Sequence, residues 1–307
     1  MSYSSDIKEE LVHIRIKNKA HKLALLCGMT QSCATLRISR STEIIYQSES
    51  SSVIKLADML GRSMYELESA IGSKQQEHRR NLLYVLAFSG KDIMLLLEDT
   101  GILSSDDSST SFDKHFPASL VSDDEICRLL IRGFFLGCGS CMNPSRGYHA
   151  EMCLRNEESA RALVYLIQNY HIKAKYSVRR DSHIVYIKGD DVSSFLALIG
   201  ANSAALNFEN VRTERDFRNY INRTANCETA NIGKTVNAGM EQLKAIEILE
   251  KHTSLESLPA PLYEAARLRL AHPEATLQEL AEMAEIGKSG MNHRLARIII
   301  LAKEYEQ

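Results

Sequence analysis

The stretch TLQELAEMAEIGKSGMNHRLARIIILAK, residues 276–303, decides how the C-terminal part of this chain folds. Thr276 and Glu279 have the spacing of a capping box, in which each side chain bonds the backbone amide of the other residue. We therefore expect one helix to begin after Thr276 and a second to begin at Lys288, joined by a tight turn over residues 285–287. The apolar positions that would form the internal face of such a helix-turn-helix are Leu280, Ala284, Ile286, Met291 and Leu295.

The turn departs from the usual chemistry of this motif. Glu285 stands where glycine is usual, and the glycine follows two residues later, at Gly287. Because residues other than glycine rarely adopt a positive φ, the sequence predicts a turn of different shape. A helix over residues 258–270, ended by His272 and Pro273, would supply the third member of a trihelical bundle.

The second helix of the motif would present polar and basic side chains near its N-terminus. Such side chains read base edges or hold phosphates in the major groove of DNA, and a helix N-terminus itself favours phosphate. The alternative is a small bundle that binds protein or merely packs. The candidate DNA-binding residues are Thr276, Gln278, Lys288, Ser289, Gly290, Asn292, His293, Arg294 and Arg297.

Composition limits the class of protein. The 307 residues suggest two or three domains. The net charge of −2 gives no strong global field, so any DNA contact must come from local basic patches. No secretory signal and no long apolar span are visible, which predicts no membrane segment. The seven scattered cysteines then indicate reduced thiols in a cytoplasmic protein.

Upstream of the motif, two similar series of elements flank the Ser- and Asp-rich stretch 104–119, which we expect to be a linker. The halves share an order of helix, strands, helix, strands and helix, which predicts a duplicated α+β domain. In the first half we expect helices over 20–28 and 53–71, strands over 33–38 and 43–47, and further apolar elements at 82–88 and 93–98. In the second half we expect helices over 125–137, 157–170 and 191–199, and strands over 147–154, 173–179 and 183–188.

A long polar helix is expected over residues 206–250, between these halves and the tail 251–307. Its Asn- and Thr-rich part favours caps or specific hydrogen bonds. Because residues 225–233 hold no long apolar run, a break between two helices is predicted there. The segment is interpreted either as a DNA-facing or hinge element, or as a polar interface that orients the tail. The residues concerned are Arg223, Asn226, Asn231, Lys234 and Thr235.

Three stretches resemble the WhiA family of bacterial regulators: RGFFLGCGS at 132–140, NRTANCETANIGKT at 222–235, and LRLAHPEATLQELAEMAEIGKSGMNHRLARI at 268–298. The resemblance implies a duplicated LAGLIDADG homing-endonuclease-like domain, with halves 1–103 and 120–205, followed by an all-α helix-turn-helix domain. It also implies a sequence-specific DNA-binding regulator, associated with the nucleoid, that acts in cell division, chromosome segregation and, in sporulating relatives, sporulation.

Double-stranded DNA is the expected partner, and no cofactor and no metal are expected. An alternative stays open, in which the chain is a scaffold of the division machinery and its tail docks a protein. The sequence leaves undecided whether another transcription regulator or a sigma factor is required, and which oligomeric state the chain adopts.

A LAGLIDADG nuclease needs an acidic residue at the end of each motif helix to hold a divalent metal. Here Cys138 takes that place in the second motif and Met29 lies near it in the first, and neither segment contains Asp or Glu. A thioether or a soft thiolate suits Mg²⁺ poorly, so cleavage is not expected. The basic residues that suit either a DNA-binding saddle or a solvated strand face are Lys173, Lys175, Arg179, Arg180 and Lys188.

Cys138 and Cys141 have the spacing of a zinc or redox site, and His149 and Cys153 follow. His149 and Cys153 are expected about 13 Å apart along one strand, whereas each zinc ligand must lie about 2.0–2.3 Å from the ion. We therefore interpret Cys138 and Cys141 as small residues at the end of a packed helix and not as parts of a zinc or redox site.

Overall fold

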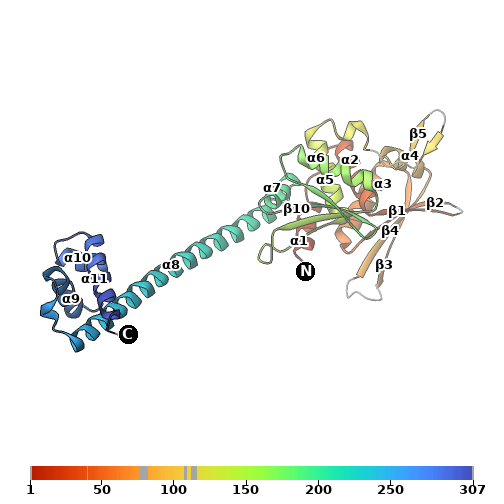
Figure 1. Cartoon of the computed structure of the whole chain (residues 1–307). Helices are drawn as coiled ribbons and strands as arrows, with labels where there is room; N and C mark the ends of the chain where they lie inside the picture. The colour runs from red at the N-terminus through yellow and green to blue at the C-terminus, as the bar shows by residue number, and fades with distance from the viewer. Residues whose placement is uncertain (1, 40, 76–81, 107–108, 112–115, 306–307) are drawn as a thin grey trace. The chain divides into compact units, whose positions relative to one another are not determined.

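The structure is a computed structural model that describes residues 2–39, 41–75, 82–106, 109–111 and 116–305 (Figure 1). The chain divides into two compact units, Met1–Glu214 and Arg215–Gln307. The first unit contains helices and antiparallel sheets and the second is helical, so the α+β prediction is confirmed. No helix in the described ranges is long and apolar enough to cross a membrane.

The first unit contains two four-stranded sheets of the same topology. Their strand orders are β1-β2-β4-β3 and β7-β8-β10-β9, which confirms the duplication. The first sheet comprises β1 (Ala34–Ile38), β2 (Thr42–Ser48), β3 (Leu67–Gln75) and β4 (Leu82–Gly90). The second comprises β7 (Gly139–Cys141), β8 (His149–Leu154), β9 (Lys175–Arg179) and β10 (Ser182–Lys188).

Helices pack against these sheets, and α2 packs closely along α5 (Figure 1). The approach is close because Gly28 and Gly133 face each other: a Cβ on Gly133 would lie 2.3 Å from the Leu25 carbonyl oxygen. Helix α1 and strand β7 were not predicted from the sequence. The helices are α1 (Tyr3–Val12), α2 (Lys19–Cys33), α3 (Ser51–Met64), α4 (Ile93–Asp99), α5 (Asp124–Cys138), α6 (Glu157–Gln168) and α7 (Asp191–Leu198).

One predicted helix was too long. The helix expected over 53–71 ends at Met64, and residues from Leu67 onward form strand β3, paired with β4. Leu67 and Ile71 lie four residues apart, a spacing that fits one face of a helix and one face of a strand equally well. Pairing with β4 decides in favour of the strand.

The predicted linker 104–119 is only partly within the described ranges. Its described part holds a two-stranded hairpin of β5 (Ser104–Asp106) and β6 (Ser109–Ser111), and the 3-10 helix η1 (Ala118–Leu120) begins within it. Residues 107–108 and 112–115 lie outside the described ranges.

The long polar helix is α8 (Asn202–His252), and it is continuous. The break predicted at 225–233 is therefore wrong. The hydroxyls of Thr224 and Thr235 donate to the carbonyls of Tyr220 and Asn231, four residues earlier, at 3.1 and 3.0 Å. This back-bonding lets threonine stay inside a helix at little cost.

The second unit is completed by η2 (Leu255–Ser257), α9 (Ala260–Ala271), α10 (Leu277–Met283) and α11 (Lys288–Lys303), which gather around the last turns of α8 (Figure 1). Their core is apolar, with Ile246 of α8, Ala265 of α9, Leu280 of α10 and Leu295 of α11 fully buried. The predicted trihelical bundle is thus present, and the end of α8 is part of its core.

Candidate nucleic-acid interface

The helix-turn-helix begins at the predicted capping box. The Thr276 hydroxyl accepts a hydrogen bond from the Glu279 amide at 3.3 Å, and the Glu279 carboxylate accepts one from the Thr276 amide at 2.7 Å. These hydrogen bonds to Thr276 lower the pKa of the Glu279 carboxyl. Amides that a helix leaves unpaired at its start are satisfied in this way, which fixes where α10 begins.

The turn keeps the left-handed conformation despite its glutamate. Glu285 has a φ of 55°, so the prediction of a different turn shape is wrong. The Ile286 amide donates to the Ala281 carbonyl at 2.9 Å and the Glu285 amide to the Glu282 carbonyl at 3.1 Å. These are the two bonds of a Schellman motif, and the partly buried Ile286 packs on the bundle core. The two hydrogen bonds and the packing of Ile286 together stabilise Glu285 in a conformation that residues other than glycine rarely adopt.

Helix α11 has one buried face and one exposed face. Met291, Leu295 and Ile298 are buried and turn toward α9 and α10. The opposite face carries the predicted polar residues, and all of the following are exposed: Lys288, Ser289, Gly290, Asn292, His293 and Arg297. Within the described part of the chain, Lys288 and Arg297 have no acidic partner. Their charges are therefore available to an anion.

Arg294 differs from its neighbours on α11. Its Nη1 donates to the Glu264 carboxylate of α9 at 2.8 Å, and only 21% of its side chain is exposed. The structure thus places Arg294 between two helices of the bundle. An orienting role within the bundle suits this position better than the DNA contact predicted for it.

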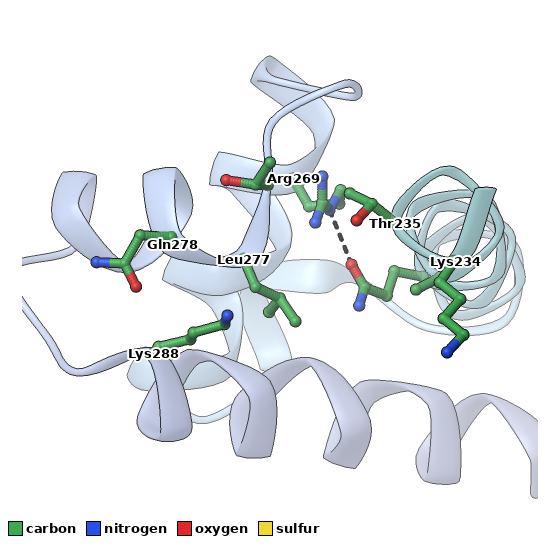
Figure 2. Close-up of a pocket in the computed structure, with 9 residues that line it drawn as sticks. Lys234, Thr235, Arg269, Leu277, Gln278 and Lys288 are labelled. Carbon is green, nitrogen blue, oxygen red and sulfur yellow. Dashed lines mark hydrogen bonds between the residues drawn. The ribbon is translucent and has the colours of Figure 1, made fainter. Parts of the chain in front are cut away.

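Several predicted residues from two distant stretches meet at one cavity (Figure 2). Lys234 and Thr235 of α8 line it together with Thr276, Gln278 and Lys288 of the helix-turn-helix. The Gln278 side-chain amide donates to Glu282 at 2.9 Å. Arg223, Asn226 and Asn231 also lie exposed on α8 but do not line this cavity.

Arg269 and Gln242, which also line the cavity, were missed by the sequence analysis. Both side chains are buried, and a lone arginine within the apolar run LRLA of residues 268–271 was the available signal. An arginine in such a run is rarely buried unless its guanidinium is paired. Arg269 is paired, and its hydrogen bond to the Ala275 carbonyl organises the loop before α10.

The basic residues of the second sheet are distributed differently from the prediction. Lys175, Arg179 and Lys188 lie on one face, opposite the core residues Val185 and Ile187, as the strand register shows. Lys173 precedes β9, and Arg180 lies in the hairpin turn with a φ of 54°, so neither is a strand residue. Glu151 partly neutralises the face, since it pairs with Arg179 at 3.6 Å and with His149 at 3.1 Å.

The two motif helices end on cysteines. Because Gly28 faces Gly133, the position equivalent to Cys138 at the end of α5 is Cys33 at the end of α2. The assignment to Met29 is therefore wrong by one helical turn, and Met29 is a fully buried core residue. Burial raises the pKa of the Cys33 thiol to about 11 and that of Cys138 to about 12.

Lys8 of α1 lies at the same place. Burial lowers its pKa, while Cys138 and Cys33 act on it in the opposite direction. A lysine and two thiols thus stand where a LAGLIDADG nuclease requires two acids. Across the residues that the structure describes, no group of three or more His, Cys, Asp and Glu side chains could hold a metal ion.

The fold and this interface define a protein with a LAGLIDADG-like unit joined to a helix-turn-helix unit. Two family models match the chain: the WhiA LAGLIDADG-like domain over residues 127–218 and the WhiA C-terminal helix-turn-helix domain over residues 221–302. A probable cell division protein WhiA of Clostridium acetobutylicum is 36% identical and covers 99% of this chain and 98% of its own length. A Clostridium perfringens relative of the same name is 37% identical, with coverage of 99% and 98%. The chain belongs to the WhiA family.

Solved structures agree with this fold. The crystal structure of full-length WhiA from Thermotoga maritima is similar, with a TM-score of 0.62, 24% identity and coverage of 99% of both chains. An N-terminal LAGLIDADG domain of WhiA matches with a TM-score of 0.53 and 20% identity, covering 65% of this chain and 90% of that one.

Proposed function

We propose that this chain is a sequence-specific DNA-binding regulator and that α11 enters the major groove. The observation that carries the proposal is the two-faced α11, buried through Met291 and Leu295 and exposed through free polar and basic side chains. Asn292 and Arg297 can contact base edges, because amide and guanidinium groups match the hydrogen-bonding patterns of adenine and guanine. Ser289, Gly290 and His293 complete this surface.

Cell division is the process in which we place this regulator, since the relatives are named as probable cell division proteins. We extend the proposal to chromosome segregation and, in sporulating organisms, to sporulation genes. Binding to chromosomal DNA would associate the protein with the nucleoid. We extend the proposal to one further partner, which would be another transcription regulator or a sigma factor.

The first unit, in this proposal, does not cleave DNA. Hydrolysis by the ancestral route requires hard oxygen ligands for Mg²⁺ at the ends of both motif helices. Cys33 and Cys138 offer thiols there, and their raised pKa keeps them protonated and neutral at physiological pH. The face with Lys175, Arg179 and Lys188 would instead add affinity for the DNA backbone.

The test is binding of the intact protein to genomic DNA fragments, including its own promoter, over a series of salt concentrations. We expect tight binding to a few fragments, with affinity falling steeply as salt rises because bound counterions are released. Weak and equal binding to all fragments would contradict sequence specificity and would favour a tail that docks a protein. Incubation of plasmid DNA with Mg²⁺ or Mn²⁺ should leave it intact, and nicking would overturn the non-catalytic assignment.

A further inference from the structure

A cavity of about 430 Å³ lies within the second unit, where α8 meets the beginnings of α10 and α11 (Figure 2). In Figure 2, Lys288 of α11 points toward Leu277, and Lys234 lies on α8 at the other side with its ammonium group turned away. Helix α8 passes close to the loop before α10, since a Cβ on Gly239 would make an ordinary contact of 3.5 Å with the Pro273 carbonyl oxygen. The cavity thus joins the long helix to the helix-turn-helix.

The lining is strongly positive. Lys234, Arg269 and Lys288 line the cavity, and none of the other described residues that line it is Asp or Glu. Within the described ranges neither lysine forms an ion pair, and both are exposed. Lysine is a flexible point charge with three donor hydrogens, so both ammonium groups can turn toward an anion in the cavity.

Arg269 supplies a fixed charge. It is 2% exposed, and its Nε donates to the Gln242 side chain at 2.9 Å. Its Nη1 donates to the Ala275 carbonyl at 2.6 Å and more weakly to two preceding carbonyls. The Nη2 group makes no hydrogen bond to any described residue, although the side chain lines the cavity. A buried guanidinium with donor hydrogens left over is a binding group for an oxyanion.

Neutral donors add to these charges. The Thr276 hydroxyl uses its oxygen to accept from Glu279, so its hydrogen remains available to a ligand. Helix α11 begins at Lys288 after Gly287 and has no side-chain cap, which leaves its first amides open. Open amides at a helix N-terminus favour negative charge.

We propose that this cavity receives a phosphate of the DNA backbone beside the groove that α11 enters. The inference rests on the proposed DNA-binding function, because Lys288 belongs both to the cavity and to the exposed face of α11. It makes α8 part of the DNA interface and explains why the Lys234–Thr235 segment lies next to the helix-turn-helix. A phosphate contact of this kind adds affinity but no sequence preference.

The test compares Lys234→Gln with Lys244→Gln in the full chain. Both residues are exposed lysines of α8, but only Lys234 lines the cavity, so the loss of charge is matched. The probe is a short fluorescein-labelled DNA duplex of arbitrary sequence, titrated over a range of salt concentrations. We expect Lys234→Gln to weaken binding several-fold and to lower the salt slope by about 1, as loss of one phosphate contact requires. Lys244→Gln should bind like the wild type.

Equal effects of the two substitutions would overturn the cavity proposal while leaving DNA binding by the protein intact. Absence of DNA binding by the wild type would overturn the proposed function as well. A calorimetric titration with inorganic phosphate distinguishes a cavity that binds a DNA phosphate from one that binds free phosphate. Saturable phosphate binding that Lys234→Gln abolishes, together with unchanged DNA binding, would assign the cavity to a free anion instead. Equal thermal melting curves of the variants confirm that each remains folded.

Discussion

Arg269 and Gln242 join two helices that lie apart in the sequence. The Arg269 Nε donates to the Gln242 Oε1 over 2.9 Å, and both side chains are buried. Since the same guanidinium holds the Ala275 carbonyl before α10, one residue fixes α8, α9 and the first helix of the helix-turn-helix together. The DNA-binding unit of this protein therefore includes the last part of α8.

Replacement of Arg269 should destabilise the second unit strongly. Arg269→Ala leaves Gln242 and the Ala275 carbonyl without their partner, and loss of such buried partners costs about 3 kcal/mol in the free energy of unfolding. Urea denaturation followed by circular dichroism measures the change. The control is Arg267→Ala, which removes an exposed arginine of the same helix and should cost less than about 0.5 kcal/mol. Similar losses in both variants would contradict the structural role of Arg269.

Gly133 should tolerate no side chain. A Cβ there would lie 2.3 Å from the Leu25 carbonyl oxygen and 3.0 Å from the Gly28 Cα, both backbone atoms that cannot move alone. Gly133→Ala therefore forces α2 and α5 apart, and we expect a loss of about 3 kcal/mol or more in the stability of the first unit. Gly72→Ala is the control, because a Cβ at this strand position meets nothing within 4 Å. Thermal melts with equal midpoints would show that the helix crossing is looser than described.

Glycine at position 285 should stabilise the turn of the helix-turn-helix. Glu285 holds a φ of 55°, a conformation that costs an L-residue about 1–2 kcal/mol. We expect Glu285→Gly to raise the free energy of unfolding of the second unit by about 1 kcal/mol, since glycine loses chain entropy but no longer suffers this strain. Glu285→Ala removes the same charge but keeps a Cβ, so it should give no gain. An equal gain from alanine in urea denaturation would attribute the effect to charge instead.

The half-buried thiol of Cys138 predicts how the first unit responds to alkaline pH. Burial raises the pKa of Cys138 from its ordinary value of 9.0 to about 12. The unfolded chain therefore ionises first, so the stabilising contribution is complete below pH 9.0 and is lost as the pH rises toward about 12. Cys138→Ala should lose less stability over this range than the wild type, as measured by urea denaturation at each pH. Parallel pH profiles for the two proteins would show that the thiol is solvated.

Much of the fold could be predicted from local sequence signals. The capping box of Thr276 and Glu279 and the strands on either side of Asp181 depend on neighbouring residues, and the structure confirms them. The end of α3 and the conformation of Glu285 depend on partners elsewhere, β4 in one case and the bundle core in the other. Local propensity could not reveal either of them.

The candidate site shows the same division. The exposed face of α11 follows from helical periodicity, so the sequence predicts it well. Arg269 and Lys8 were missed because their positions depend on contacts with distant residues, and the ion pair of Arg294 with Glu264 could not be predicted for the same reason. The motif position at the end of the first helix was assigned to Met29 and not to Cys33. Only the close approach of Gly28 to Gly133 fixes the register of the two motif helices.

The central claim is that α11 reads DNA sequence, and selection of bound sites from a random DNA library tests it most directly. We predict that the wild type enriches one defined motif and that Asn292→Ala changes the preferred base at one position, since each base contact contributes about 1–3 kcal/mol of discrimination. Lys234→Gln should enrich the wild-type motif with weaker affinity. Failure of the wild type to enrich any motif, or an unchanged motif with Asn292→Ala, would contradict the claim.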